Sequence, residues 1–312
     1  MSSRITVITP VFNCEDYIRE TIESVLSAIN CEEIEYIVVN DGSNDNTLGI
    51  LNEYSDRIKI LTHPNSGESS SVNVGLQEAQ GSLILIVSAD DPLISSSIFH
   101  GVENFFALNQ QIVAWYPDWQ MIDSEGKVLK IIQVEDYSED ALIGEFKCLP
   151  GPGTIFRKDA ALQIGGRNPN WRFVGDYDFW LRLSRHGRFE KRPGVLAQWR
   201  FHSNSTSIAN RNTQMASERI SVIENFLNDC SISGRLRRKA LSHAYYCAAR
   251  LVFFDPNIAG KKLLLKAFKF RRGFIEGANA IVAIYILTMP ISSFIYAIFR
   301  PWLKRFKRFE YL

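Results

Sequence analysis

Four short polar clusters interrupt the first 92 residues, and each follows a hydrophobic segment with the composition of a buried strand. In an open α/β sheet, ligands bind beyond the carboxyl ends of the strands. Four polar clusters on that one rim would therefore form a binding site. The clusters are residues 9–13, 40–43, 65–67 and 89–91.

Two adjacent carboxylates, Asp90 and Asp91, end the fourth cluster between an apolar strand and Pro92. Charged groups at such a place must face solvent, a partner or a metal ion. A divalent cation held by one or two carboxylates can share its other positions with a bound diphosphate and neutralise the charge that grows as the diphosphate leaves. A strand-end turn in which an aspartate caps the next helix explains the same residues equally well.

Two further side chains could contact a nucleotide or its metal ion. Asp41 precedes Gly42 after a β-branched strand, so its carboxylate could accept a hydrogen bond from a base N–H, although Asp-Gly is also a common turn. His202 follows the last strand of the body. A neutral imidazole among carboxylates shifts metal preference from Mg²⁺ toward Mn²⁺, whereas a loop histidine is otherwise usually an exposed residue.

A candidate general base stands at the start of an amphipathic helix, where Asp176 and Asp178 follow Gly175. A carboxylate there could accept the proton of an attacking hydroxyl. Asp176 is the first choice. Asp178 is the fallback, because it lies on another face of the helix and can pair with Arg182 one turn later. The alternative for Asp176 is a carboxylate that only stabilises the helix N-terminus.

The elements that must position these groups alternate regularly over residues 5–88. Strands and helices that alternate at this pace predict right-handed βαβ units and a parallel sheet, and hence an α/β fold. After Pro92 strands and helices alternate less regularly, and a hairpin at Glu125 and Gly126 predicts that the second half of the sheet is mixed. The region beyond Thr213 is expected to be helical, and the expected strands are 5–11, 36–40, 58–62, 83–88, 112–116, 153–157 and 189–200.

Composition limits the choice of partner. A chain of 312 residues with 46% hydrophobic residues can bury a sizeable core. Residues 261–312 hold 11 of the 35 basic and 2 of the 34 acidic residues, which leaves a charge of +9 there and −8 in the body. An acidic body argues against a nucleic-acid partner. A basic, apolar tail suits an anionic membrane surface, with a solvated basic face as the alternative.

Residues 278–299 carry no charge and are numerous enough to span a bilayer, but Pro290 stands in the middle. Basic residues flank both ends, so a re-entrant or in-plane hairpin bent at Pro290 is favoured over a single span. A packed helical subdomain is the third alternative. Five scattered cysteines and the lack of a signal-peptide pattern favour a reducing cytoplasm. We therefore expect the protein at the cytoplasmic face of the membrane.

The ordered motifs of residues 4–205 resemble those of inverting glycosyltransferases of family 2, of the bacterial polysaccharide type. The resemblance implies the glycosyltransferase A fold, with a nucleotide-binding half, an acceptor half and one divalent metal ion between them. It implies that Asp90 and His202 bind the metal ion, with Asp91 as a further candidate, and that Asp176 is the base. Asp41 would recognise the nucleotide base, commonly uracil, and further nucleotide contacts would come from Thr9, Pro10, Phe12, Glu15, Asn65, Gly67 and Ala89.

Three positions depart from the family pattern: Val72 replaces an arginine, Ser88 an acidic residue and Gly175 a glutamate. These departures motivate a rival prediction, a catalytically inactive nucleotide-binding scaffold or partner of such an enzyme. A dinucleotide-dependent oxidoreductase is a poorer rival, because no G-x-G-x-x-G follows the first strand.

The resulting prediction is a metal-dependent, inverting hexosyltransferase that acts by single displacement. It would move a sugar from a nucleotide-sugar, preferably a UDP-sugar, to a glycan or lipid-linked glycan in cell-surface polysaccharide assembly, with Mn²⁺ or Mg²⁺ as cofactor. The catalytic domain would span residues 1–210, with a nucleotide-binding half, 1–92, and an acceptor half, 93–210. A helical subdomain, 211–272, and a membrane-associating tail, 273–312, would follow.

Overall fold

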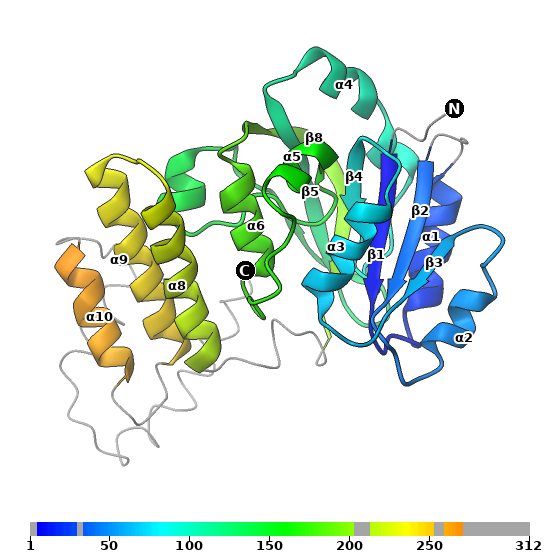
Figure 1. The fold of residues 1–312 in the computed structure, drawn as a ribbon, viewed down its shortest axis with the longest axis horizontal. Coiled ribbons are helices and arrows are strands. Elements are labelled where there is room, and N and C mark those ends of the chain that lie inside the picture. Colours follow the sequence, from blue (N-terminus) through cyan, green and yellow to red (C-terminus); the bar gives the residue numbers. More distant parts are fainter. Residues whose placement is uncertain (1–4, 30–33, 203–212, 253–258, 271–312) are drawn as a thin grey trace.

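The structure is a computed structural model that describes residues 5–29, 34–202, 213–252 and 259–270. A central sheet carries helices on both faces, and a group of helices packs beside its second half (Figure 1). The segment 278–299, for which membrane association is predicted, lies outside the described residues. Within the described ranges, no helix combines the length and the apolarity that crossing a bilayer requires.

The first half of the sheet is parallel, which confirms the prediction. Its strands are β1 (Ile5–Val11), β2 (Ile34–Asn40), β3 (Lys59–Thr62) and β4 (Leu83–Ile86), and they pair in the order β3-β2-β1-β4. Parallel strands covered on both faces read as continuous apolar runs rather than alternating ones. The connecting helices are α1 (Ile18–Ala28), α2 (Thr47–Asn52) and α3 (Glu68–Glu78).

The second half of the sheet is mixed, as the sequence after Pro92 predicts. β7 (Ile155–Arg157) runs antiparallel to β4. β5 (Ile112–Ile122) runs antiparallel to β7 and pairs in parallel with β8 (Arg188–Arg200). β6 (Val128–Ile132) returns against β5 through the predicted turn, in which Gly126 has a φ of +85°. β5 is longer than the sequence predicts, because its pairing with β8 continues past Pro117.

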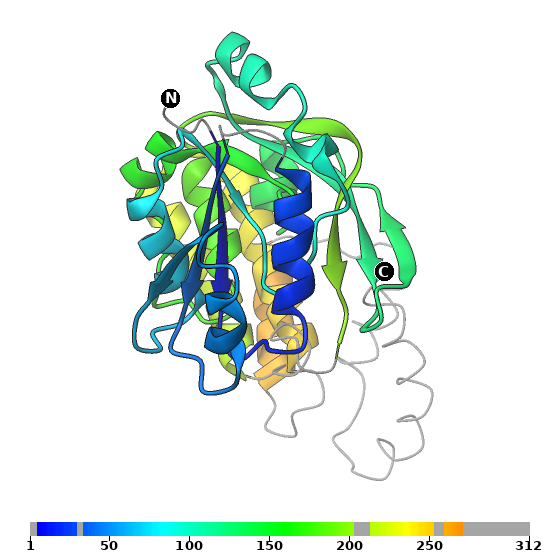
Figure 2. The ribbon, with the colours of Figure 1, turned by 90° about the vertical axis from the view of Figure 1, so that its right-hand side faces the viewer.

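Adjacent residues of β1 face opposite layers of the core. Val7 packs in a cluster with Ile18 and Ile22 of α1, whereas Ile8 packs in a cluster with Leu76 of α3. Figure 2 shows β1 between α1 and α3. The second half adds α4 (Val102–Leu108), α5 (Lys158–Gln163), α6 (Gly175–Leu183), the 3₁₀ turn η1 (Ser96–Phe99) and the π turn η2 (Asp140–Gly144).

The described part of the chain beyond Thr213 is helical, as predicted. It forms α8 (Thr213–Asp229), α9 (Gly234–Leu251) and α10 (Ala259–Phe270). Val222 and Ile223 of α8 share a hydrophobic cluster with Phe179 of α6, so α8 packs directly against the sheet domain. Tyr245 of α9 and Leu264 of α10 belong to a smaller cluster of their own. The division of the chain into domains stays a prediction.

Helix α3 approaches β1 so closely that position 75 has no room for a side chain. A Cβ atom at Gly75 would lie 2.5 Å from Cγ2 of the fully buried Ile8. Gly75→Ala should therefore lower the free energy of unfolding by about 1–3 kcal/mol relative to Gly234→Ala, because overpacking a core forces shifts. A Cβ at Gly234, the first residue of α9, would find its nearest atom 3.6 Å away, on the flexible side chain of Arg238. Equal stability of the two variants in urea would contradict this packing.

Candidate active site

Polar side chains tie the loop after β1 to the loop after β2. The Asn13 side chain accepts a hydrogen bond from the backbone N–H of Asn44 at 2.7 Å, and the N–H of Asn13 donates to Oγ of Ser43 at 3.0 Å. The Glu15 carboxylate accepts from the N–H of Asn46 at 2.8 Å. Glu15, a predicted nucleotide contact, therefore also holds these two loops together.

Asp41 ties the second polar cluster to the third. Its carboxylate is buried, with Oδ1 accepting the backbone N–H of Ser66 at 2.7 Å and Oδ2 accepting that of Gly67 at 2.9 Å. Each carboxylate oxygen can accept more than one hydrogen bond. Asp41 thus shapes the loop that leads into α3, and its predicted contact with a nucleotide base would be made in addition to this structural role.

Two of the predicted nucleotide contacts, Thr9 and Ala89, have buried side chains, and their contact with a nucleotide stays a prediction. Thr9 is fully buried, and its hydroxyl lies 3.1 Å from the hydroxyl of Tyr36. Ala89 is also buried, and its carbonyl accepts a hydrogen bond from Thr21 of α1 at 2.8 Å. Both residues serve the core beneath the rim.

Phe12, Asn65 and Gly67 are exposed at the rim, where the nucleotide contacts are predicted. The Phe12 side chain is 45% exposed and presents a flat apolar surface, while Pro10 before it is buried in β1. Gly67 has a φ of +90°, so its backbone conformation favours glycine although the surrounding space is open. Their contacts with a nucleotide stay predictions.

Asp90 and His202 meet at the same rim. Nε2 of His202 lies 2.8 Å from Oδ2 of Asp90, although 112 positions separate the two residues in the chain. The His202 side chain is 13% exposed and the Asp90 side chain 25%. The Tyr17 ring packs against the imidazole, with ring centroids 5.1 Å apart. The structure therefore brings together the two residues that the sequence predicts as metal ligands.

Asp91 turns into the protein, which corrects its candidacy as a further metal ligand. Its side chain is buried, and Oδ1 accepts the backbone N–H of Arg200 at 2.7 Å. Burial and the neighbouring charge of Asp90 raise the pKa of the Asp91 carboxyl well above its ordinary value. Asp91 therefore anchors β8 to the turn after β4.

Arg200 is the residue of this rim that sequence reasoning missed. It is 1% exposed, and its guanidinium donates to the carbonyls of Asp90 at 2.8 Å and Ser124 at 3.0 Å and to Oε2 of Glu20 at 2.6 Å. The guanidinium also lies over the Tyr17 ring, 4.9 Å from its centroid. The available signal was a charged residue at the end of an apolar strand, which must find several partners if it is buried.

The residues at this rim fit a divalent cation that takes part of its coordination from a ligand. In the described part of the chain, no group of three or more His, Cys, Asp or Glu side chains is placed to hold a metal ion. Asp90 and His202 would supply one carboxylate and one imidazole. Ions such as Mg²⁺ are often held by one or two protein ligands and complete their shell with substrate phosphates and water, and an imidazole favours Mn²⁺.

Asp176 lies in the first turn of α6, where the two halves of the sheet domain meet. A Cβ at the preceding Gly175 would lie 2.9 Å from Oγ of Ser69 in α3, so the two helices approach closely there. The Asp176 side chain is exposed, yet protein atoms surround its carboxyl closely enough that desolvation raises its pKa. The guanidinium of Arg167 partly opposes this rise. A raised pKa means that this carboxyl binds a proton more readily than an ordinary aspartate does.

Asp178, the fallback base, already pairs with another side chain. It is buried, and its Oδ2 accepts hydrogen bonds from Nε and Nη2 of Arg182 at 2.8 and 2.6 Å. Arg182 also donates to the carbonyls of Ile164 and Gly166 at 2.7 and 2.8 Å. Asp178 therefore holds the loop before α6, and the structure favours Asp176 of the two carboxylates.

Arg167 is a second residue that the sequence did not point to. Its backbone N–H and carbonyl both bond the side-chain amide of Asn73, at 2.7 Å each. Its Nη1 pairs with Oε1 of Glu68 at 2.6 Å. These contacts fasten the loop before α6 to helix α3. Only the tertiary fold reveals them, because 94 positions separate Asn73 and Arg167.

The sheet order and the polar rim define an α/β protein with the glycosyltransferase A fold, and solved structures agree. S. aureus TarS 1–349 in complex with UDP-GlcNAc has a TM-score of 0.67 at 16% identity, over 86% of this chain and 80% of that one. The mannosyltransferase PcManGT from Pyrobaculum calidifontis, in complex with GDP-Man and Mn²⁺, has a TM-score of 0.56 at 14% identity, over 97% and 83%. At these identities the likeness shows the fold alone.

Sequence comparison identifies the family. The profile described as glycosyl transferase family 2 matches residues 6–118. An uncharacterized glycosyltransferase of Rickettsia prowazekii is 30% identical over 217 residues, which make up 66% of this chain and 66% of that protein. The chain belongs to glycosyltransferase family 2.

Removing the Arg200 guanidinium should destabilise the fold. Arg200→Met leaves the partly buried carbonyl of Asp90 without this donor and removes the charged bond to Glu20. We expect the free energy of unfolding to fall by about 3 kcal/mol or more, measured in urea. Arg19→Met is the matched control, because Arg19 makes an exposed ion pair with Glu53. Similar unfolding midpoints for the two variants would contradict the role assigned to Arg200.

Proposed function

We propose that this chain is a metal-dependent, inverting glycosyltransferase that uses a UDP-sugar. The observation that carries the proposal is the 2.8 Å contact between His202 and Asp90 at the rim of the sheet. A carboxylate and an imidazole at this rim suit a divalent ion that also binds a diphosphate. The UDP-GlcNAc bound by S. aureus TarS and the Mn²⁺ bound by PcManGT support the proposed donor and metal.

In the proposed reaction, the donor lies across the rim, with its base against Phe12 and Asp41. When bound, the metal ion would neutralise charge on the departing diphosphate. Asp176 takes the proton of the acceptor hydroxyl as that oxygen attacks the anomeric carbon. The new C–O bond forms on the face opposite the bond to the diphosphate, which breaks and takes its electron pair with it. One such displacement inverts the anomeric configuration.

Two of the three departures from the family pattern have packing explanations. Val72 is fully buried in the cluster that contains Ile8, so this position faces the core. Gly175 packs against Ser69, where a larger side chain would force a shift between α3 and α6. Ser88 is exposed and leaves Asp90 as the first acidic residue of the turn. The rival function, an inactive scaffold, would bind nucleotide without turning it over.

The proposed acceptor is a glycan or a lipid-linked glycan in cell-surface polysaccharide assembly. The proposal includes attachment to the cytoplasmic face of a membrane. It is supported by the charge of +9 in residues 261–312, a range that contains the uncharged segment 278–299. Such an arrangement would bring Asp176 to an acceptor held at the lipid surface.

Nucleotide and metal ion should bind together. We expect UDP with Mn²⁺ to raise the melting temperature of the wild-type protein, because a ligand at about 100 times its Kd adds about 2.7 kcal/mol of stability. Asp90→Asn and His202→Gln should lose the Mn²⁺-dependent part of this shift and the metal-dependent release of UDP from a UDP-sugar. Asp56→Asn, at an exposed position of the same half, is the matched control.

The outcomes of this measurement separate the alternatives. A shift with UDP alone that Mn²⁺ does not change would remove the metal ion from the proposal. A Mn²⁺-dependent shift without release of UDP from any UDP-sugar would favour the inactive scaffold.

Transfer should depend on ionised Asp176. Because desolvation raises the pKa of this carboxyl, the rate should fall on acidification with a midpoint above about 3.9, the ordinary value for aspartate. Asp176→Asn should keep the UDP and Mn²⁺ shift, lose about 10²- to 10⁴-fold in transfer rate and lose this pH dependence. The measurement is the initial rate of UDP release across pH. Rates like wild type in Asp176→Asn would remove it as the base, and Asp178→Asn would then be measured.

A further inference from the structure

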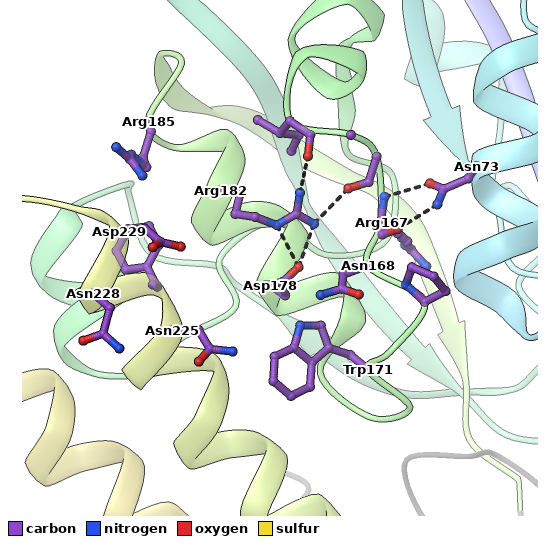
Figure 3. Close-up of a pocket in the computed structure, with 15 residues that line it drawn as sticks. Asn73, Arg167, Asn168, Trp171, Asp178, Arg182, Arg185, Asn225, Asn228 and Asp229 are labelled. Carbon is purple, nitrogen blue, oxygen red and sulfur yellow. Dashed lines mark hydrogen bonds and ion pairs between the residues drawn. The ribbon is translucent and has the colours of Figure 1, made fainter.

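A polar cavity of about 560 Å³ lies between the loop 164–171, helix α6 and the C-terminal turns of α8 (Figure 3). This volume is typical of small-molecule sites. The residues placed at the rim for the donor, Phe12, Asp41, Asp90 and His202, do not line the cavity. The cavity therefore belongs to the acceptor half and its junction with the C-terminal helices.

One wall of the cavity is rigid. Arg182 bonds Asp178 and the carbonyls of Ile164 and Gly166, and the amide of Asn73 bonds the backbone of Arg167 at both its N–H and its carbonyl (Figure 3). The guanidinium of Arg182 pairs with Asp178, and that of Arg167 pairs with Glu68 through Nη1. The wall thus presents a fixed shape in which both arginines already have a carboxylate partner.

The facing wall carries polar groups with spare hydrogen-bonding capacity. Asn225, Asn228 and Asp229 project from the last turns of α8, and Arg185 follows α6 (Figure 3). All four side chains are exposed, and among the described residues none makes a hydrogen bond or an ion pair. Two amides, one carboxylate and one guanidinium supply both donors and acceptors within a single wall.

Trp171 gives the cavity an aromatic surface. Its ring is half-buried, and its Nε1–H is buried without a hydrogen-bond partner in the described structure. Because no solvent-sized group reaches this N–H, the part of Trp171 that the cavity offers to a ligand is its ring. Trp115, another aromatic residue of this half, instead stacks on Phe105 with centroids 4.0 Å apart.

This lining matches one class of ligand better than the others. A sugar has hydroxyls that both donate and accept, as asparagine amides do, and C–H faces that pack on an aromatic ring. A phosphate or nucleotide needs several free cations. Here Arg182 is paired with Asp178 and Arg167 with Glu68, so Arg185 is the one unpaired cation among the described lining residues. An apolar ligand would leave the polar groups of α8 without partners.

We propose that this cavity binds a stretch of the acceptor glycan, as a subsite for sugars beyond the one that reacts, an inference that rests on the proposed function. Trp171 connects the cavity to the reacting centre, because a Cβ at Gly175 would lie 3.9 Å from Cβ of Trp171, and Asp176 is the next residue. A glycan whose terminal hydroxyl reaches Asp176 can therefore continue along Trp171 toward α8. The cavity then selects acceptors by the sugars that precede the reacting end.

Direct binding tests the subsite without relying on catalysis. The protein is applied to an array of oligosaccharide fragments of bacterial surface polysaccharides, two to six sugars long, and the best ligand is titrated by calorimetry. The double variant Asn225→Ala/Asn228→Ala should raise its Kd about tenfold or more, since each lost hydrogen bond costs about 1 kcal/mol. Trp171→Phe, which keeps an aromatic face and loses the N–H, should raise Kd by a smaller factor.

Matched controls identify the site. Asn52→Ala removes an exposed amide on α2, far from the cavity lining, and should leave the Kd unchanged. The double variant should also keep the stabilisation by UDP and Mn²⁺, which shows that it is folded. With long acceptors its KM should rise while kcat stays near wild type.

Failure of the subsite and failure of the proposed function give different results. No binding to any glycan of the array, or equal affinity of wild type and double variant, overturns the subsite even if UDP and Mn²⁺ bind as expected. The protein could instead bind a glycan, with weaker binding in the double variant, and show no response to UDP and Mn²⁺. That result would support the cavity as a glycan site and contradict the proposed transferase function.

Discussion

The buried guanidinium of Arg200 is the constraint on which the arrangement of the rim depends. A charge inside a protein is costly unless its donors are all bonded. Arg200 meets this need with the carbonyls of Asp90 and of the β5–β6 turn and with the carboxylate of Glu20 in α1. Three separate parts of the chain are thereby held around the end of β8. His202 follows two residues later, so its contact with Asp90 is a consequence of satisfying this cation.

A second set of contacts holds the first and second halves of the sheet domain in a fixed relative position. The side-chain amide of Asn73 bonds the backbone of Arg167, and the absence of a side chain at Gly175 leaves room for Ser69. Helix α3, which begins at the polar rim, and helix α6, which carries Asp176, are therefore fixed relative to each other. Preorganisation of this kind is what a single displacement requires, because donor and base must be aligned before the bond forms. The cavity beside α8 shares the same rigid wall.

The sequence predicts the strands, the parallel first half, the mixed second half and the pairing of Asp90 with His202, since these depend on hydrophobic runs and ordered motifs. It does not predict which way Thr9 and Asp91 face. Every residue of β1 is buried, so its hydrophobic pattern does not indicate which side chains face the core and which face the rim. The neighbouring carboxylates Asp90 and Asp91 point in different directions from their turn, and the sequence does not indicate which of them is buried. The partners of Arg200 and the cavity beside α8 depend on contacts between distant segments, which no local pattern encodes.

In the proposed site, Asp90 and His202 hold a divalent ion against the diphosphate of the donor. The most direct test is the position of Mn²⁺, found by anomalous X-ray scattering from crystals grown with UDP and Mn²⁺. We expect one anomalous peak within bonding distance of Asp90 Oδ2, of His202 Nε2 and of the phosphates of UDP. A peak elsewhere, or UDP bound at the rim with Mn²⁺ in contact with neither residue, would contradict it.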